Sequence, residues 1–162
     1  MQGRSVPAPI FCCLFFVFIF NKEINYRGVS SVDFATISAT NTNKESAGVI
    51  VQQPSAPCLL CSSIDGVLLC VDMSNRVIAA IQIDSGIRCV RGDYLAGSNI
   101  AIVGCTDGSI RVLSMETGLF REVNRHNVVH IGGVTALSTI NQNSIVSGGE
   151  DGNVRVWTIK ST

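Results

Sequence analysis

Charged residues are scarce in this sequence: Asp, Glu, Lys and Arg make up 15% of 162 residues, with 12 acidic and 12 basic side chains. The basic residues form no cluster, which excludes the electrostatic footprint of a protein that binds nucleic acid. The sequence also lacks a glycine-rich phosphate loop, a nucleophile elbow, a Ser or Cys spaced to work with a His, and a dense set of metal ligands. We therefore expect no enzymatic activity, no cofactor, no metal ion and no small-molecule substrate.

Helical periodicity is absent after residue 25, whereas β-branched residues are frequent, so the sequence predicts an all-β protein. The clearest strand pattern covers residues 144–159, where two short β-branched runs flank a Glu-Asp-Gly turn. An Asp-Gly pair between such runs predicts a tight hairpin, because glycine accepts the positive φ that the turn requires. One hairpin is only marginally stable in water, so further strands must pack beside it.

The Asp-Gly turn occurs three times, at Asp65-Gly66, Asp107-Gly108 and Asp151-Gly152, at intervals of 42 and 44 residues. Apolar runs precede and follow each turn, and a further run lies upstream of each at a nearly constant distance. A fourth run follows the third strand of the first two units. Four short strands in a unit of about 40–45 residues are typical of one blade of a β-propeller.

The third unit carries polar residues at characteristic positions. His130 lies just before the upstream apolar run, Ser147 lies four residues before Asp151, and Trp157 lies six residues after that aspartate. In these residues the chain resembles the WD-repeat β-propeller family, and the resemblance extends over residues 48–159. It implies that the four side chains form a buried hydrogen-bond network within one blade.

The first two units depart from this pattern. They keep the turn aspartates Asp65 and Asp107, which the resemblance assigns to the same structural position, and they lack the other three side chains. Lys44 and Gly86 stand at the histidine position, Cys61 and Val103 at the serine position, and Val71 and Leu113 at the tryptophan position.

A structural role for the network also follows from the residues themselves. An aspartate in a tight turn between buried strands needs hydrogen-bond donors, because an unpaired buried polar group costs about 1–3 kcal/mol. His130 and Trp157 can supply such donors to Asp151 and its surroundings. The alternative is a catalytic His–Asp pair, but no nucleophile motif accompanies it.

The expected architecture is a partial WD-repeat β-propeller of about three four-stranded antiparallel blades within residues 48–162. Three blades cannot close a propeller, so we expect the chain to be part of a longer protein; pairing with another chain and an unstable product are the alternatives. Val49–Val51 is expected to be the innermost strand of the first blade. Segment 25–47 is expected to be a strand followed by a polar loop. The strand, Val32–Ile37, takes the place of the outermost strand of a preceding blade. The three repeats cover about 48–83, 86–123 and 130–160.

Residues 1–24 differ in composition from the rest of the chain. They contain Ile10–Phe20, an apolar run of 11 residues, which is shorter than the roughly 20 residues of a membrane-spanning helix. The run suits the core of a signal peptide, but no small-x-small cleavage site follows it. Three interpretations stay open: a weak signal or anchor segment, a buried edge element, and a non-native leader.

The sequence favours a binding scaffold with other proteins as partners. The resemblance implies that partners dock on one face of the disk, at the residues just before the turn aspartates and at the start of the third inner strand. Glu150 is the strongest candidate, and an ordinary solvated turn residue is its alternative. The candidate contact residues are Ile64, Thr106, Ile131, Gly132 and Glu150.

The expected location is the cytoplasm. Seven cysteines, an odd number, and the absence of an Asn-x-Ser/Thr acceptor favour it. The third repeat is similar to repeats of axonemal and microtubule-associated WD proteins, which implies a cytoskeletal or ciliary site. The rival hypothesis is a membrane-tethered or secreted small β domain that uses residues 10–20.

Overall fold

The computed structural model describes residues 28–37, 56–74, 76–92, 99–116, 119–141 and 144–158, which form eleven β-strands and no helix. In chain order the strands are β1 (Val29–Ile37), β2 (Ala56–Ser63), β3 (Val67–Asp72), β4 (Val77–Gln82), β5 (Ile87–Arg91), β6 (Ile100–Cys105), β7 (Ile110–Glu116), β8 (Leu119–His126), β9 (Val134–Asn141), β10 (Ser144–Gly149) and β11 (Val154–Thr158). The predicted all-β fold is confirmed.

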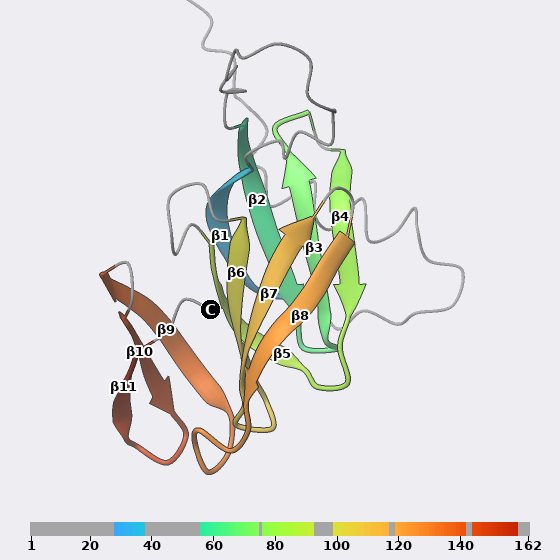
Figure 1. Ribbon diagram of the computed structural model, residues 1–162. Helices are drawn as coiled ribbons and strands as arrows, with labels where there is room; N and C mark the ends of the chain where they lie inside the picture. The colour runs from blue at the N-terminus through green and yellow to red at the C-terminus, as the bar shows by residue number, and fades with distance from the viewer. Residues whose placement is uncertain are drawn as a thin grey trace, which may run out of the picture.

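The strands form three successive blades (Figure 1). Strands β1–β4 make blade 1 and strands β5–β8 make blade 2, each as a run of antiparallel neighbours. Strands β9–β11 make blade 3, which has three strands in the described part of the chain. The predicted partial propeller is therefore confirmed.

The Asp-Gly turns between the second and third strands of the blades share one geometry. Gly66, Gly108 and Gly152 have φ values of 87°, 78° and 71°. Each glycine N–H donates to the carbonyl oxygen three residues earlier, with N···O distances of 3.1, 3.2 and 3.1 Å. A side chain would strain a backbone in this left-handed region, so the glycine of each pair is needed for the turn.

The position of β1 in blade 1 differs from the position predicted for it. β1 is the innermost strand of this blade, because it pairs antiparallel with β2, with Val32 opposite Cys61; its prediction as the outermost strand of a preceding blade is wrong. Asp33 links this strand to the end of β5, since its carboxylate accepts a hydrogen bond from the Gly92 N–H (3.0 Å) and lies 3.4 Å from Arg91 Nη1. The predicted inner strand Val49–Val51 lies outside the described residues.

Blades 1 and 2 belong to one eight-stranded sheet that folds back on itself, in the order β1-β2-β3-β4-β8-β7-β6-β5. The outermost strands β4 and β8 meet in parallel where Ala80 lies opposite Leu119. The two blades thereby enclose a shared apolar core, which gives them most of their stability, because burying each large aliphatic side chain contributes about 1.5–3 kcal/mol. Its largest fully buried members are Leu60, Leu68, Ile87, Val90, Val103 and Leu113.

A second core joins blade 2 to blade 3. Gly104 lets the two blades approach closely, since a Cβ atom there would lie 2.7 Å from Val134 Cγ1 and 2.6 Å from Cys89 Sγ. Burial raises the pKa of the Cys89 thiol to about 11, so this cysteine acts as an apolar packing residue. The cluster consists of Cys89, Ile102, Ile110, Val129, Val134, Leu137 and Ile145.

The predictions for residues 1–24 and for the loop after β1 lie outside the described residues. In the part of the chain that the structure describes, no helix is long and apolar enough to span a membrane.

Candidate functional site

The tight turns of all three blades lie at one end of the molecule, the lower end in Figure 1. The segments that lead into β5 and β9 run across the preceding turns, as their backbone hydrogen bonds show. The Ile83 N–H donates to the Gly66 carbonyl (2.9 Å), and the N–H groups of Val129 and His130 donate to the Gly108 carbonyl (2.9 and 3.2 Å). We call this end, formed by residues 64–66, 83–86, 106–108, 127–133 and 150–152, the turn face.

In blade 3 the structure brings together the four polar residues that the sequence singles out. Trp157 Nε1–H donates to Ser147 Oγ (2.9 Å), which lies 2.8 Å from His130 Nε2. His130 Nδ1 lies 2.9 Å from Asp151 Oδ1. Because the ionised Asp151 carboxylate can only accept, Nδ1 of the ring carries a proton and donates it to the aspartate.

Asp151 receives more hydrogen bonds than the one from the ring. Its oxygens also accept from the N–H groups of Ile131 (3.2 Å) and Asn153 (3.1 Å) and from Arg155 Nη1 (2.9 Å). Arg155 donates to the Val129 carbonyl as well. Loss of solvation by itself raises the pKa of this carboxyl, but the hydrogen bonds, that of His130 first, hold it well below its usual range.

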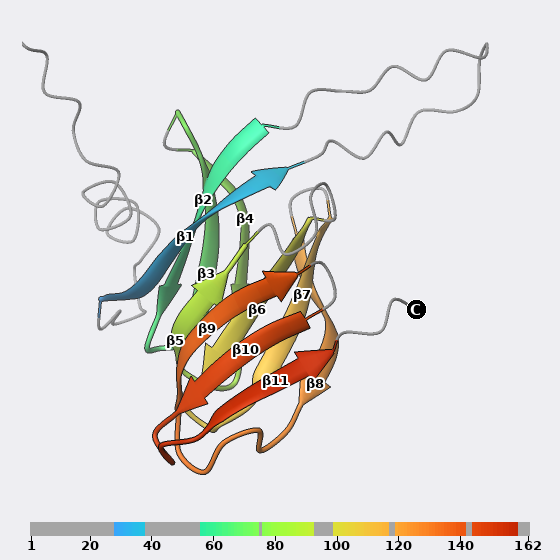
Figure 2. The same cartoon turned by 90° about the vertical axis from the view of Figure 1, so that its left-hand side faces the viewer.

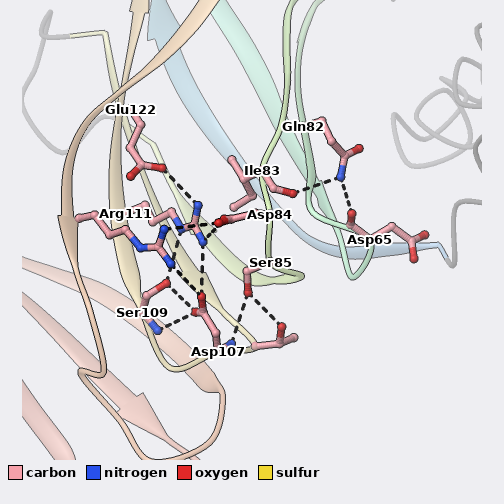
Figure 3. Close-up of polar contacts among 11 residues, drawn as sticks. Asp65, Gln82, Ile83, Asp84, Ser85, Asp107, Ser109, Arg111 and Glu122 are labelled. Carbon is pink, nitrogen blue, oxygen red and sulfur yellow. Dashed lines mark hydrogen bonds and ion pairs between the residues drawn. The ribbon is translucent and has the colours of Figure 1, made fainter.

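In blade 2 the main side-chain partner within the turn region is an arginine in place of the histidine of blade 3. Arg111 lies four residues after Asp107, and its side chain is only 3% exposed. Its guanidinium lies 2.5 Å from Asp84 Oδ1, 3.2 Å from Glu122 Oε2 and 3.4 Å from Asp107 Oδ2. Arg125 contacts the same two aspartates at 3.5 and 3.3 Å. Figure 3 shows Arg111 surrounded by these carboxylates, and we call the five residues the Arg111 cluster.

Asp107 caps the tight turn of blade 2 with its side chain. Its Oδ1 accepts from the N–H (2.9 Å) and the hydroxyl (2.6 Å) of Ser109. Burial raises the pKa of Asp107, but the Ser109 hydrogen bonds and the charges of Arg111 and Arg125 outweigh it and lower the pKa below its ordinary value. The pKa of Asp84 is lowered by its hydrogen bond to Arg111 and by the charge of that arginine.

Blade 1 has neither arrangement. Leu69 stands where the other two blades carry an arginine after the turn. The turn is instead held through its backbone, because Gln82 Nε2 donates to the carbonyl oxygens of Asp65 (2.6 Å) and Ile83 (3.3 Å), as Figure 3 shows.

All five predicted contact residues lie on the turn face, and they differ in what they do there. Glu150 is ion-paired with Arg88 of blade 2 (2.6 Å) and accepts from the Gly133 N–H (2.9 Å), and these two partners lower its pKa. Gly132 packs against the same carboxylate. Thr106 Oγ1 lies 3.2 Å from the Ser85 hydroxyl. Ile64 and Ile131 are exposed large apolar side chains.

Sequence reasoning did not identify Val128 on this face. Its side chain is 73% exposed, close to the 78% of Ile131, and its φ is 50°. A β-branched residue in the left-handed region is a genuine conformational outlier. No pattern in the sequence predicts this exposed, left-handed valine, since Val128 looks like an ordinary apolar residue in a connection between two blades.

One feature of the sequence could have indicated the Arg111 cluster. An arginine follows the turn aspartate by four residues both at Asp107–Arg111 and at Asp151–Arg155. Its other members, Asp84, Glu122 and Arg125, could not be found in this way, because they come from strand β8 and from the connection between β4 and β5. Within the described ranges, no group of three or more His, Cys, Asp and Glu side chains is arranged to hold a metal ion.

Three consecutive antiparallel blades that turn the same tight loops toward one face define this chain as a partial β-propeller. The chain is similar to Cilia- and flagella-associated protein 52, with 34% identity to the Sus scrofa protein over 90 residues and 35% to the Homo sapiens protein over 89. These matches cover 54% and 53% of this chain and 14% of each relative. No protein-family model matches the chain.

Solved structures give the same fold. The computationally designed Ika8 protein is 28% identical, with a TM-score of 0.51 over 63% of this chain and 30% of the designed one. A chain of the mitotic checkpoint complex has a TM-score of 0.61 over 86% of this chain and 39% of its own length. At 10% identity, this second likeness concerns the fold alone.

Proposed function

We propose that this chain is part of a larger cytoplasmic WD-repeat protein and acts as a protein–protein interaction scaffold, with the turn face as its docking surface. The observation that carries the proposal is the pair of exposed apolar side chains, Val128 and Ile131, on a firmly anchored segment. Exposed apolar groups grouped on one face mark sites of interaction more often than scattered ones do.

The segment that carries Val128 and Ile131 is anchored by the two residues between them. Val129 and His130 are buried between the two exposed residues, and both donate backbone hydrogen bonds to Gly108. The segment therefore presents Val128 and Ile131 in a fixed geometry, and a partner would lose little conformational entropy in ordering them. A valine at positive φ costs about 1–2 kcal/mol in the free protein. Such strain, with no packing of the side chain to offset it, is typical of functional sites.

An enzymatic function receives no support from the same geometry. Every polar atom of the His130 ring has a partner within the blade, and the ring is buried beneath the turn face. A general base must reach a substrate proton within hydrogen-bond distance. We therefore assign His130 and Asp151 to the architecture of blade 3, together with Ser147 and Trp157, and we assign Asp107 and Asp65 to the turns of their own blades.

Similarity to Cilia- and flagella-associated protein 52 supports a ciliary or cytoskeletal place for the scaffold. The chain matches only 14% of the length of these relatives, so this step belongs to the proposal. The test of this proposal therefore uses isolated axonemes as the binding partner.

The experiment is co-sedimentation of the purified chain with salt-washed axonemes. We expect saturable binding by the wild type and a loss of about tenfold or more in affinity for Ile131→Asp and Val128→Asp, as for interface anchor residues. Asp tolerates the left-handed region better than Val, so V128D should remain folded. The matched control is Val123→Asp, which places the same charge at an exposed apolar position on β8, away from the turn face.

Two results would contradict the proposal. One is the absence of saturable binding by the folded wild-type chain. The other is an equal affinity of I131D, V128D and V123D, which would mean that binding does not use the turn face.

A further inference from the structure

The apolar pair Val128 and Ile131 lies between the tight turns of blades 2 and 3. The connection that carries the pair runs along the lower end of the molecule in Figure 2, beside the turn between β10 and β11. The backbone of this connection donates hydrogen bonds to Gly108, in the turn of blade 2. It also contacts the turn of blade 3, since a Cβ atom at Gly132 would lie 2.8 Å from Glu150 Oε2.

Asp84 belongs to the connection into β5, which contacts the same turn of blade 2. The Asp107 N–H donates to Ser85 Oγ (3.4 Å), and Figure 3 shows Asp84 and Asp107 beside the same arginine. Taken blade by blade, the turn face therefore carries these two aspartates in blade 2, then the apolar pair, and then Glu150 in blade 3.

The charged residues within the turn face have one sign. Its residue ranges contain five carboxylates and neither lysine nor arginine. The arginines that pair with the carboxylates belong to strands: Arg88 to β5, Arg111 to β7, Arg125 to β8 and Arg155 to β11. The acidic partners are thus on the loops of this face, and the basic partners are on the strands that lead to it.

In two of these ion pairs the carboxylate is the more exposed partner. Asp84 is 70% exposed, whereas the Arg111 side chain is 3% exposed. Glu150 is 45% exposed and Arg88 is 36% exposed. Asp151 is placed differently, since its side chain is 7% exposed and that of its arginine partner is 35% exposed. The turn face therefore offers a partner mainly the carboxylates of Asp84 and Glu150.

The sign of these charges selects the kind of partner. A carboxylate that is already ion-paired still has lone pairs for further donors. A lysine or arginine of a partner would add charge-assisted hydrogen bonds at Asp84 and Glu150. An acidic partner would meet like charges at the same positions, which disfavours it. An apolar centre within a polar rim is the usual organisation of a protein interface.

We propose that the turn face binds a segment of a partner protein in which large apolar side chains are flanked by lysine or arginine. The apolar side chains contact Val128 and Ile131, and the flanking cations contact Asp84 and Glu150. The assignment rests on the proposed function, because it uses the same docking surface, and it adds the chemistry of the partner.

The test uses the purified full chain and three fluorescein-labelled heptapeptides. The first is Lys-Lys-Leu-Ser-Leu-Lys-Lys, the second is its acidic counterpart Glu-Glu-Leu-Ser-Leu-Glu-Glu, and the third is Lys-Lys-Ser-Ser-Ser-Lys-Lys, which lacks the apolar centre. Fluorescence anisotropy measures the three dissociation constants. We expect the first peptide to bind at least about tenfold more tightly than either of the others, because only it has both the apolar anchors and the complementary charges. Raising NaCl from about 50 to about 500 mM should weaken its binding about threefold or more, as for exposed charge pairs.

Variants of the chain assign the contact to the turn face. Ile131→Ser removes the apolar contact without adding charge, and it should weaken binding of the first peptide about tenfold. Asp84→Asn and Glu150→Gln each keep an acceptor oxygen and remove the charge, and each should weaken this binding about threefold. The matched control is Asp72→Asn, which should leave the affinity unchanged. Asp72 is also paired with an arginine, Arg76 (2.9 Å), but it lies at the end of β3 away from the turn.

Three results would overturn the proposal. The first is the absence of binding of the first peptide below about 1 mM, a weak affinity for any specific contact. The second is an equal affinity for the first peptide and its acidic counterpart. The third is an effect of D84N and E150Q no larger than that of D72N. Circular dichroism identifies a variant that has lost its fold, and the two carboxylate variants belong to different blades, so that either one can serve if the other unfolds.

The peptide assay and the axoneme assay fail separately. Axoneme binding that I131D and V128D weaken, together with peptides that the chain does not distinguish, would leave the docking surface in place and refute the partner's chemistry. Peptides that behave as expected, together with no saturable binding to axonemes, would refute the axonemal partner and leave the chemistry of the turn face in place.

Discussion

Arg111 and Arg155 occupy equivalent positions in successive blades, 44 residues apart and each four residues after a turn aspartate, yet only Arg111 is buried. In blade 3 the histidine, serine and tryptophan fill the space beneath the turn, and Arg155 lies over them with 35% of its side chain exposed. In blade 2 those positions hold Gly86, Val103 and Leu113, and the Arg111 guanidinium is buried among carboxylates instead. The two blades thus provide different partners for the equivalent turn aspartates: mainly a hydrogen-bond network in blade 3 and mainly ion pairs in blade 2.

Replacing Arg111 by leucine should therefore destabilise the chain. Its removal takes the buried counter-charge out of the cluster: Glu122 loses its arginine partner, and Asp84 and Asp107 keep only the more exposed Arg125 as a counter-charge. Breaking a buried ion pair in this way costs about 3–5 kcal/mol. Because these carboxylates are partly exposed, we expect the lower part of that range, about 3 kcal/mol. Urea denaturation measures it. Arg121→Leu, an exposed arginine on the neighbouring strand β8, is the control and should stay within about 0.5 kcal/mol of the wild type.

Ser147→Ala tests the network of blade 3. The substitution removes the acceptor of the Trp157 N–H and the donor to His130 Nε2, and each buried group left unpaired costs about 1–3 kcal/mol. We expect a loss of about 3 kcal/mol in the free energy of unfolding, measured by urea denaturation with Trp157 fluorescence as the probe. Ser138→Ala, at an exposed serine on β9 of the same blade, should change it by less than about 0.5 kcal/mol. Equal losses in the two variants would mean that the network adds no stability.

The network of blade 3 illustrates what the sequence could predict. His130, Ser147, Asp151 and Trp157 all belong to one repeat, and strand register alone brings them together. The Asp-Gly turns were predictable for a similar reason, because the required positive φ has few solutions and glycine is the chief one.

Features that depend on long-range pairing could not be predicted. The sequence predicts a strand at Val32–Ile37, but a strand pattern does not say which neighbour the strand takes. Its inner position follows from its pairing with β2 and its contacts with β5, both of which are distant from it in the sequence. Likewise, the interaction of Glu150 with Arg88 joins two blades and requires the blade-to-blade packing to be known first.

Acid should destabilise this fold. The pKa values of Asp107 and Asp151 are below their ordinary values in the folded state, whereas in the unfolded chain they return to about 4. Folding therefore favours the charged carboxylates, and this stability is present above the unfolded pKa and lost as the pH falls through the folded pKa. We expect a free energy of unfolding that is constant from pH 8 to 5 and falls below about pH 4.

Urea denaturation at a series of pH values measures this dependence, and Asp107→Asn provides its control. The variant is less stable at pH 7 but should lose less on acidification, because it has no carboxylate to protonate at this site. A wild-type stability that rises between pH 5 and pH 3 would contradict the sign of the argument.

Alanine substitutions at Gly108 and Gly152 distinguish two costs in the free energy of unfolding: backbone strain within a turn, and steric overlap where one blade packs on the next. Both have positive φ, 78° and 71°, so alanine strains either turn by about 1–2 kcal/mol. A Cβ atom at Gly108 would lie 2.1 Å from the His130 carbonyl oxygen, whereas one at Gly152 would meet nothing within 4 Å. We therefore expect Gly108→Ala to cost at least about 2 kcal/mol more than Gly152→Ala in urea denaturation, as for overpacking. Equal costs would mean that the segment leading into β9 does not press on the turn of blade 2, and the blade-to-blade contact that anchors Val128 and Ile131 would then be absent in solution.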